Sequence, residues 1–182
     1  ELTFSEKLPT AASLSDRVIS VESLSKAFGV PGIRIGWLAC QDDGLIEKFL
    51  ATKEQVSICN SLVDENLEYA ILSQKDKLLP PINKDRMEKF ALVKAWLANH
   101  SVLEWVEPKG GVICFPHIRT NIAIDVEKFY STLNQKYGTF VGPGHWFEMD
   151  DRFFRLGYAW CSRDQLKEGL KNIDSALEAS RK

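Results

Sequence analysis

The sequence predicts an α/β fold that passes into a smaller α+β domain, and three observations support this prediction. The run 17–22, which is rich in β-branched residues, and the run 34–40 predict strands. Apolar residues recur at helical spacing in the segments that follow, which predicts helices that cover these strands. A double proline at 80–81 is expected to end one helix before the next begins. We therefore place one domain over residues 1–79 and a second over residues 80–182.

Apolar spacing and capping residues predict the helices on either side of the domain boundary. Apolar residues at near-helical spacing predict a helix over 43–57. Either Asn60 or Ser61 is suited to cap the next helix, because short polar side chains accept hydrogen bonds from the first turn. Beyond the prolines, an apolar stripe spaced three and four apart predicts a strong helix over 83–100. The two domains are thus expected to be joined at an interrupted helix.

The second domain alternates strands and helices. The runs 112–118 and 153–159 predict strands. Asp125 is placed to cap a helix that ends near Gly138, since glycine is common just past a helix C-terminus. Ser162 is followed three residues later by glutamine, the spacing of a capping box, which predicts the start of the last helix.

Composition excludes several classes of function. The chain has 182 residues, a net charge of −2 and no basic run, so nothing favours binding to nucleic acid. It contains no apolar stretch of about 18 residues and opens without the pattern of a signal peptide, so we expect a cytoplasmic protein away from membranes. Its four cysteines form no C-x-x-C pair and its three histidines lack ligand spacing, so we expect no metal site.

The stretch VESLSKAFGVPGIRIGW, residues 21–37, carries one amine and one guanidinium among small residues. A lysine attacks a carbonyl only in its neutral form, which a nearby cation favours, so Lys26 beside Arg34 fits covalent chemistry. Arginine also binds phosphate with a planar fork, and the hydroxyls of Ser23 and Ser25 can donate to phosphate oxygens. These groups suit a ligand with an aldehyde at one end and a phosphate at the other, and pyridoxal phosphate is such a ligand.

Two short motifs in this stretch carry a family resemblance. Ser-Leu-Ser-Lys-Ala-Phe at 23–28, followed by Gly-Ile-Arg-Ile-Gly at 32–36, resembles the cofactor-attachment motif of class I/II aminotransferases, which are fold-type I pyridoxal-phosphate enzymes. The resemblance implies that the chain is the C-terminal part of the large cofactor-binding α/β domain followed by a small α+β domain. It also implies that Lys26 is the Schiff-base lysine and that Arg34 binds the cofactor phosphate. The alternative is a surface lysine on a glycine-rich loop.

The resemblance continues downstream. Phe-Val-Gly-Pro-Gly at 140–144 looks like the family's substrate-side loop, and Phe-Arg-Leu-Gly-Tyr-Ala at 154–159 looks like the strand whose arginine binds the substrate α-carboxylate. The resemblance therefore implies that Arg155 is the carboxylate-binding residue. Two alternatives stay open here: Arg155 pairs with an aspartate at 150–151, or Arg152 takes the carboxylate in its place.

The first residues depart from the family pattern. Family members have the sequence Asp-Glu-x-Tyr at the place where this chain begins with Glu-Leu-Thr-Phe. If Glu1 is that glutamate, Thr3 takes the place of the tyrosine that touches the cofactor ring hydroxyl; a shift by one residue would place Phe4 there. A threonine hydroxyl is shorter and less acidic than a phenol, so the reaction type is left open.

The function implied by the resemblance is that of an aminotransferase, which moves an amino group between an amino acid and a 2-oxo acid. Family members are usually homodimers, so a homodimer is implied as well. Two alternatives remain. One is a lyase, cyclase or decarboxylase that uses the same cofactor, and the other is a non-catalytic sensor module with the same fold.

Overall fold

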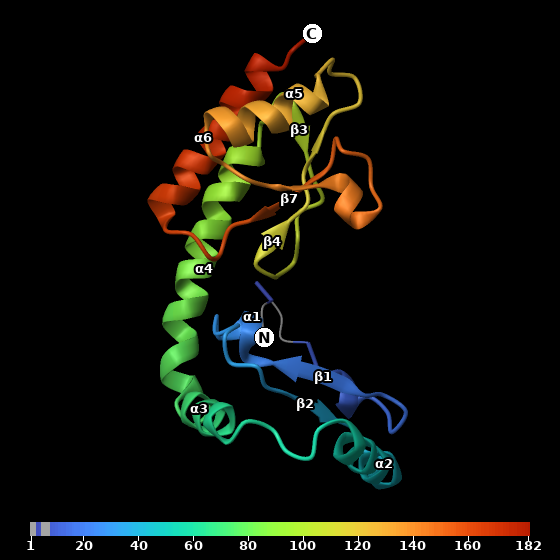
Figure 1. The fold of residues 1–182 in the computed structure, drawn as a ribbon. Coiled ribbons are helices and arrows are strands. Elements are labelled where there is room, and N and C mark those ends of the chain that lie inside the picture. The colour runs from blue at the N-terminus through green and yellow to red at the C-terminus, as the bar shows by residue number, and fades with distance from the viewer. Residues whose placement is uncertain (1–2, 5–7) are drawn as a thin grey trace. The chain divides into compact units, whose positions relative to one another are not determined.

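The computed structural model describes residues 3–4 and 8–182, and the chain divides into two compact units, Glu1–Asn83 and Lys84–Lys182 (Figure 1). The expectation for Glu1 lies outside the described residues. The boundary between the units falls within one long helix, α4 (Lys75–Leu97). Each unit is described by itself below.

The first unit is built on two antiparallel strands, β1 (Ser20–Ser23) and β2 (Gly36–Ala39). Ser20 lies opposite Ala39 and Ser23 lies opposite Gly36. Glycine is required at position 36, because a Cβ there would lie 2.5 Å from the backbone oxygen of Glu22. These strands confirm the two strands predicted in this part of the chain, each within a few residues of its expected bounds.

Short helices flank this strand pair, and longer ones follow it. The former are η1 (Ala11–Ser13) and α1 (Leu24–Ala27). The latter are α2 (Asp43–Val56) and α3 (Leu62–Leu72), which confirm the helices expected there. The cap of α3 is Ser61, whose Oγ accepts from the N–H of Asp64 at 3.3 Å, so the structure decides between the two predicted caps.

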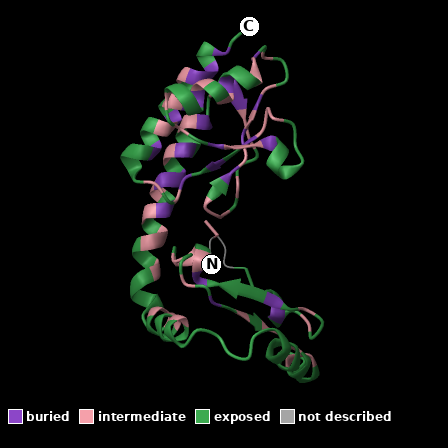
Figure 2. Ribbon diagram, in the orientation of Figure 1, coloured by how far each residue is buried: buried purple, intermediate pink, exposed green. Residues whose placement is uncertain are grey.

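Neither α2 nor α3 contains a buried residue. Figure 2 shows the consequence: buried residues gather in the second unit, while most of the described first unit is exposed. Large apolar side chains are therefore left open to solvent on the first unit, where such patches usually mark surfaces that meet other protein. They include Val21, Val56, Ile58, Leu62, Val63 and Tyr69, which are between 69% and 87% exposed.

The predicted break at the double proline is wrong. Helix α4 runs without interruption from Lys75 to Leu97, with Pro80 and Pro81 inside it. Each proline removes one N–H that would bond a carbonyl four residues earlier, so the carbonyls of Asp76 and Lys77 lose their helical donors. Both of those residues are exposed, so water replaces the lost donors and the helix continues.

The second unit holds two small antiparallel sheets. One has the order β4 (Ile113–Cys114), β7 (Phe154–Gly157), β6 (Gly142–Pro143), and the other pairs β3 (Leu103–Glu104) with β5 (His117–Ile118). The single strand expected over 112–118 is therefore wrong, because the chain leaves β7 after Cys114 and joins β3 at His117. Pro116 lies at the change of partner, where its missing N–H costs no ladder bond.

The remaining helices cover these strands. They are α5 (Val126–Ser131), the following turn η2 (Thr132–Lys136), η3 (Gly144–Phe147) and α6 (Arg163–Ala179). In Figure 1, α5 and α6 lie next to each other on one side of the strands.

Both caps predicted in the second unit are confirmed. Asp125 accepts from the N–H of Lys128 at 3.0 Å, and Ser162 forms a full capping box with Gln165. The core of this unit comes from the helices α4, α5, η2 and α6 and from the strands β3, β5 and β7. Its fully or almost fully buried apolar side chains include Val93, Leu103, Ile118, Phe129, Leu133, Phe154, Tyr158, Ile173 and Leu177.

Candidate functional site

Lys26 lies in α1, immediately after β1, and its side chain is exposed. Ser23 caps this four-residue helix by accepting from the N–H of Ser25 at 3.4 Å. Over the part of the chain that the structure describes, the Lys26 amine has no hydrogen bond or ion pair. The amine is therefore accessible to a ligand.

Arg34 lies just before β2, at the same end of the strand pair as Lys26. The register explains this placement, because Ser23 opposite Gly36 makes the end of β1 and the start of β2 coincide. Arg34 is exposed, and its Nη1 donates to the Pro31 backbone oxygen at 2.7 Å, which holds the side chain against its own loop. The other guanidinium N–H groups remain available to an anion.

One end of the β1–β2 pair therefore carries an amine, a guanidinium and two serine hydroxyls. The Ser23 oxygen accepts the cap hydrogen bond, and its own O–H is still able to donate. Gly29 in the intervening loop has φ of 68°, a conformation that favours glycine. Such a group of donors suits a phosphate-bearing carbonyl compound.

The second unit separates the two arginines that the sequence proposed for the carboxylate. The Arg152 guanidinium donates to three backbone oxygens, those of Ile118 at 3.2 Å, Arg119 at 2.5 Å and Ile122 at 2.7 Å. It is therefore committed to holding the loop that follows β5. Arg155 is exposed on β7 and forms no ion pair or hydrogen bond with any residue that the structure describes.

Among the described residues, Arg155 forms no ion pair or hydrogen bond with Asp150 or Asp151, so the alternative that it pairs with an aspartate is not supported. The Asp150 carboxylate accepts from the N–H of Arg152 at 2.7 Å. The Asp151 carboxylate accepts from the His145 backbone N–H at 2.9 Å and lies 2.7 Å from its Nδ1. The Arg155 guanidinium instead lies over the Phe147 ring, 5.9 Å from its centroid.

A row of aromatic rings accompanies Arg155. The Phe147 ring packs edge-on against Phe115 at 5.5 Å, which stacks on Phe153 at 5.5 Å, which in turn stacks on His117 at 4.4 Å. Phe153 and Arg155 are two positions apart and so lie on the same face of the strand, opposite the buried face of Phe154. The arrangement is suited to a carboxylate attached to an apolar body.

Sequence reasoning missed the role of Phe147 and the pairing of His145 with Asp151. The His145 N–H groups fix the Asp151 carboxylate from two sides, and the backbone hydrogen bond is the main reason that the pKa of Asp151 lies below its ordinary value. Asp151 is six residues from His145, and no local pattern relates them. The contact between His145 and Asp151 is visible only in the structure, where η3 brings the two residues together.

Within 3–4 and 8–182, no three or more histidine, cysteine, aspartate or glutamate side chains are grouped to hold a metal ion. Over the same residues, none of the helices has both the length and the apolar character needed to cross a membrane.

Comparison with known proteins relates this geometry to a family. The model of the family described as aminotransferase class I and II matches residues 2–173. A crystal structure of a PLP-dependent aminotransferase from Streptococcus suis 89-1591 aligns with a TM-score of 0.86 and 28% identity, over 99% of this chain and 47% of that one.

Two relatives carry other descriptions. Capreomycidine synthase of Streptomyces vinaceus is 30% identical over 163 residues, which are 89% of this chain and 41% of that protein. The HTH-type transcriptional regulator NorG of Staphylococcus aureus is 26% identical over 179 residues, 95% of this chain and 40% of that protein. The chain thus spans about two fifths of the length of these relatives. The resemblance and the mixed α/β fold predicted from the sequence are confirmed, and the chain belongs to the aminotransferase class I and II family.

Proposed function

We propose that this chain is the part of a pyridoxal-phosphate-dependent aminotransferase that carries the cofactor lysine and the substrate-binding arginine. The observation that supports this most directly is the exposed, uncommitted Lys26 amine at the same end of the β1–β2 pair as Arg34. The reaction proposed is the transfer of an amino group between an amino acid and a 2-oxo acid. A homodimer, as the family resemblance implies, is part of the proposal.

The residues at this end of the strand pair fit the cofactor. The Lys26 amine suits the aldehyde, while Arg34 and the hydroxyls of Ser23 and Ser25 suit the phosphate. The Arg34 side chain is already fixed by its hydrogen bond to the Pro31 carbonyl, so little side-chain entropy is lost when it binds an anion. When bound, pyridoxal phosphate supplies an electron sink for the substrate α-carbon.

Lys26 has two tasks in this proposal. It holds the cofactor covalently at rest, and once released its Nζ takes the proton from the substrate α-carbon as a general base. Among the residues that the structure describes, the Lys26 amine makes no hydrogen bond or ion pair that must break when it moves, which suits it to this exchange.

Arg155 receives the substrate α-carboxylate. Its guanidinium keeps its donors free and lies over the Phe147 ring, which limits the rotation of the planar group. A bidentate arginine–carboxylate pair is strong and directional, so it orients the substrate as well as binding it. Arg152 has no part in this role, because its donors are used by three backbone carbonyls.

A second candidate function has support of its own. The 30% identity to capreomycidine synthase favours a cyclase or lyase that uses the same residues, and so does the assignment of Thr3, rather than Phe4, to the place of the ring-contacting tyrosine. The two candidates differ in products. An aminotransferase converts a 2-oxo acid into its amino acid at the expense of a donor, whereas a lyase releases ammonia or another leaving group.

The test uses the natural protein with pyridoxal phosphate. Reduction with borohydride followed by peptide mapping should label Lys26, and Lys26→Ala should lose both the label and turnover. Lys48→Ala is the matched control, because that lysine is also exposed but lies on α2. Label on another lysine, or full turnover by Lys26→Ala, would refute the proposal. An amino-donor assay on the unaltered protein then separates transfer from elimination.

A further inference from the structure

A cavity of about 610 Å³ lies between α5 and the turn η3, within the second unit. We call it the aromatic cavity. Its walls come from α5 and η2, from the segment 139–143, and from η3 together with Asp151. The side chains that matter here are Glu127, Tyr130, Phe140, His145, Trp146 and Asp151. None of them belongs to the cofactor or carboxylate sites described above.

Two large aromatic rings at this cavity are open to solvent. Phe140 is 64% exposed and Trp146 is 58% exposed, and their ring centroids are 5.6 Å apart. The His145 ring meets Trp146 edge-on at 6.4 Å. The faces of aromatic rings are electron-rich and attract cations, so exposed rings at a cavity are suited to a cationic ligand.

Two carboxylates line the aromatic cavity. Glu127 and Asp151 are acidic, no lysine or arginine is among the described residues that line it, and the Asp151 carboxylate lies 2.7 Å from His145 Nδ1. The His145 backbone N–H holds the pKa of Asp151 below its ordinary value, so Asp151 is ionised at neutral pH. Burial raises the pKa of Tyr130, whose hydroxyl lies 2.9 Å from the carbonyl oxygens of Asp151 and Phe153, so this phenol stays neutral.

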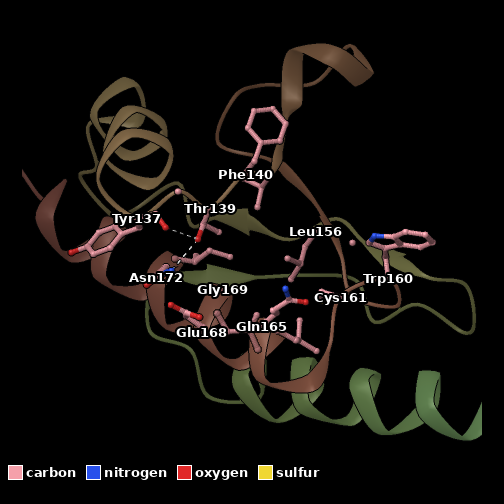
Figure 3. A pocket seen from close by; sticks show the side chains of 16 residues that line it. Tyr137, Thr139, Phe140, Leu156, Trp160, Cys161, Gln165, Glu168, Gly169 and Asn172 are labelled. Carbon is pink, nitrogen blue, oxygen red and sulfur yellow. Dashed lines mark hydrogen bonds between the residues drawn. The ribbon is translucent and has the colours of Figure 1, made fainter.

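A neighbouring hollow provides a contrast. It lies between residues 137–141 and α6, and Figure 3 shows Glu168 and Trp160 far apart within it. Its central polar groups also satisfy each other, because Asn172 Nδ2 donates to Thr139 Oγ1 at 2.9 Å. Glu168 and Trp160 are separated in this way and do not converge on one ligand.

From this convergence of open aromatic rings and carboxylates we propose that the aromatic cavity binds an organic ammonium ion with an apolar body. The cation is attracted by the ring faces and by the carboxylates together, and its apolar part covers the exposed rings. A neutral or anionic molecule of the same size is not attracted electrostatically by the rings and the carboxylates, so the site discriminates by charge. The proposal does not depend on the activity proposed for Lys26.

The test measures binding of benzyltrimethylammonium to the natural protein, loaded with pyridoxal phosphate, by titration calorimetry. Benzyl alcohol and benzoate serve as neutral and anionic probes of similar size. We expect the cation to bind and both other probes to bind more weakly by roughly tenfold or more. Equal binding of benzoate, or no binding of the cation to the folded protein, would overturn the proposal.

Variants locate the site. Trp146→Ala and Glu127→Gln should each weaken cation binding by roughly fivefold, as expected for one cation–π or one charge contact. Trp160→Ala is the matched control, because that ring is 85% exposed but belongs to the neighbouring hollow. An effect of Trp160→Ala that equals the effect of Trp146→Ala would place the ligand elsewhere and refute the assignment. If Trp146→Ala instead changes the oligomeric state seen in sedimentation and leaves cation binding intact, the surface is a contact between copies and the proposal fails.

Discussion

The contrast between Arg152 and Arg155 leads to a sharp prediction, because the two side chains are three residues apart and have opposite surroundings. Arg152→Met removes hydrogen bonds from a charged donor to the oxygens of Ile118, Arg119 and Ile122. Such bonds contribute about 1.5–3 kcal/mol each, but water reaches part of this loop once the arginine is gone. We therefore expect the free energy of unfolding to fall by about 3 kcal/mol.

Arg155→Met should behave in the opposite way. The side chain is exposed and makes no hydrogen bond with the described residues, so the free energy of unfolding should change by less than about 0.5 kcal/mol. Loss of a bidentate pair with the substrate carboxylate should cost about 3 kcal/mol in transition-state binding, which lowers kcat/KM roughly a hundredfold.

Two measurements decide between these expectations. Urea denaturation gives the unfolding free energy of each variant, and kcat/KM is measured with the best amino donor from a panel of amino acids. Arg155→Lys adds a control, because it keeps the charge but loses the planar fork. If Arg155→Met destabilises the fold as much as Arg152→Met, or retains full kcat/KM, the assignment of Arg155 to the substrate is wrong.

Three further predictions follow from local geometry. Gly144→Ala should lower the free energy of unfolding by about 2 kcal/mol or more, since its Cβ would collide with the backbone oxygen of Asp150; an unchanged urea midpoint would contradict this. The depressed pKa of Asp151 means that its stabilising effect is complete above the unfolded pKa and is lost as pH falls through the folded value, so Asp151→Asn should flatten the acid limb of the stability curve. An unaltered acid limb would show that the contact with His145 is not stabilising. Burial raises the pKa of Cys114 to about 12, so iodoacetamide should label it only after denaturation, as mass spectrometry can establish.

Much of the local structure could be predicted because its causes lie within a few residues. The caps at Asp125 and Ser162 depend on one side chain and the N–H groups of the next turn, and both are confirmed. The strand pair in the first unit was predicted from the runs 17–22 and 34–40, and the family from the motif around Lys26.

The predictions that proved wrong concern segments whose structure depends on solvent exposure or on contacts with distant strands. A proline pair was taken as a break, but the exposed carbonyls of Asp76 and Lys77 tolerate the loss of their donors. The run 112–118 was taken as one strand, although its two ends pair with different partners. Strand partners are set by contacts between distant segments, and a single sequence does not contain that information in readable form.

The site shows the same division. The motif resemblance implied roles for Lys26 and Arg34, and the register of β1 and β2 places both at the same end of the strand pair. The choice between Arg152 and Arg155 was left open, because only the fold reveals which guanidinium is used by backbone carbonyls. The aromatic cavity was not predicted at all, since α5 and η3 contribute to it from distant positions.

The turn η3 has a consequence for how this protein can change over evolutionary time. Three successive side chains share it: His145 and Trp146 line the aromatic cavity, while Phe147 supports Arg155. A substitution in η3 that changes the aromatic cavity also shifts the backbone that positions Phe147 against Arg155, and the reverse holds as well. Lineages that alter the selectivity of one surface should therefore carry compensating changes at the other, and the two should be inherited as a unit.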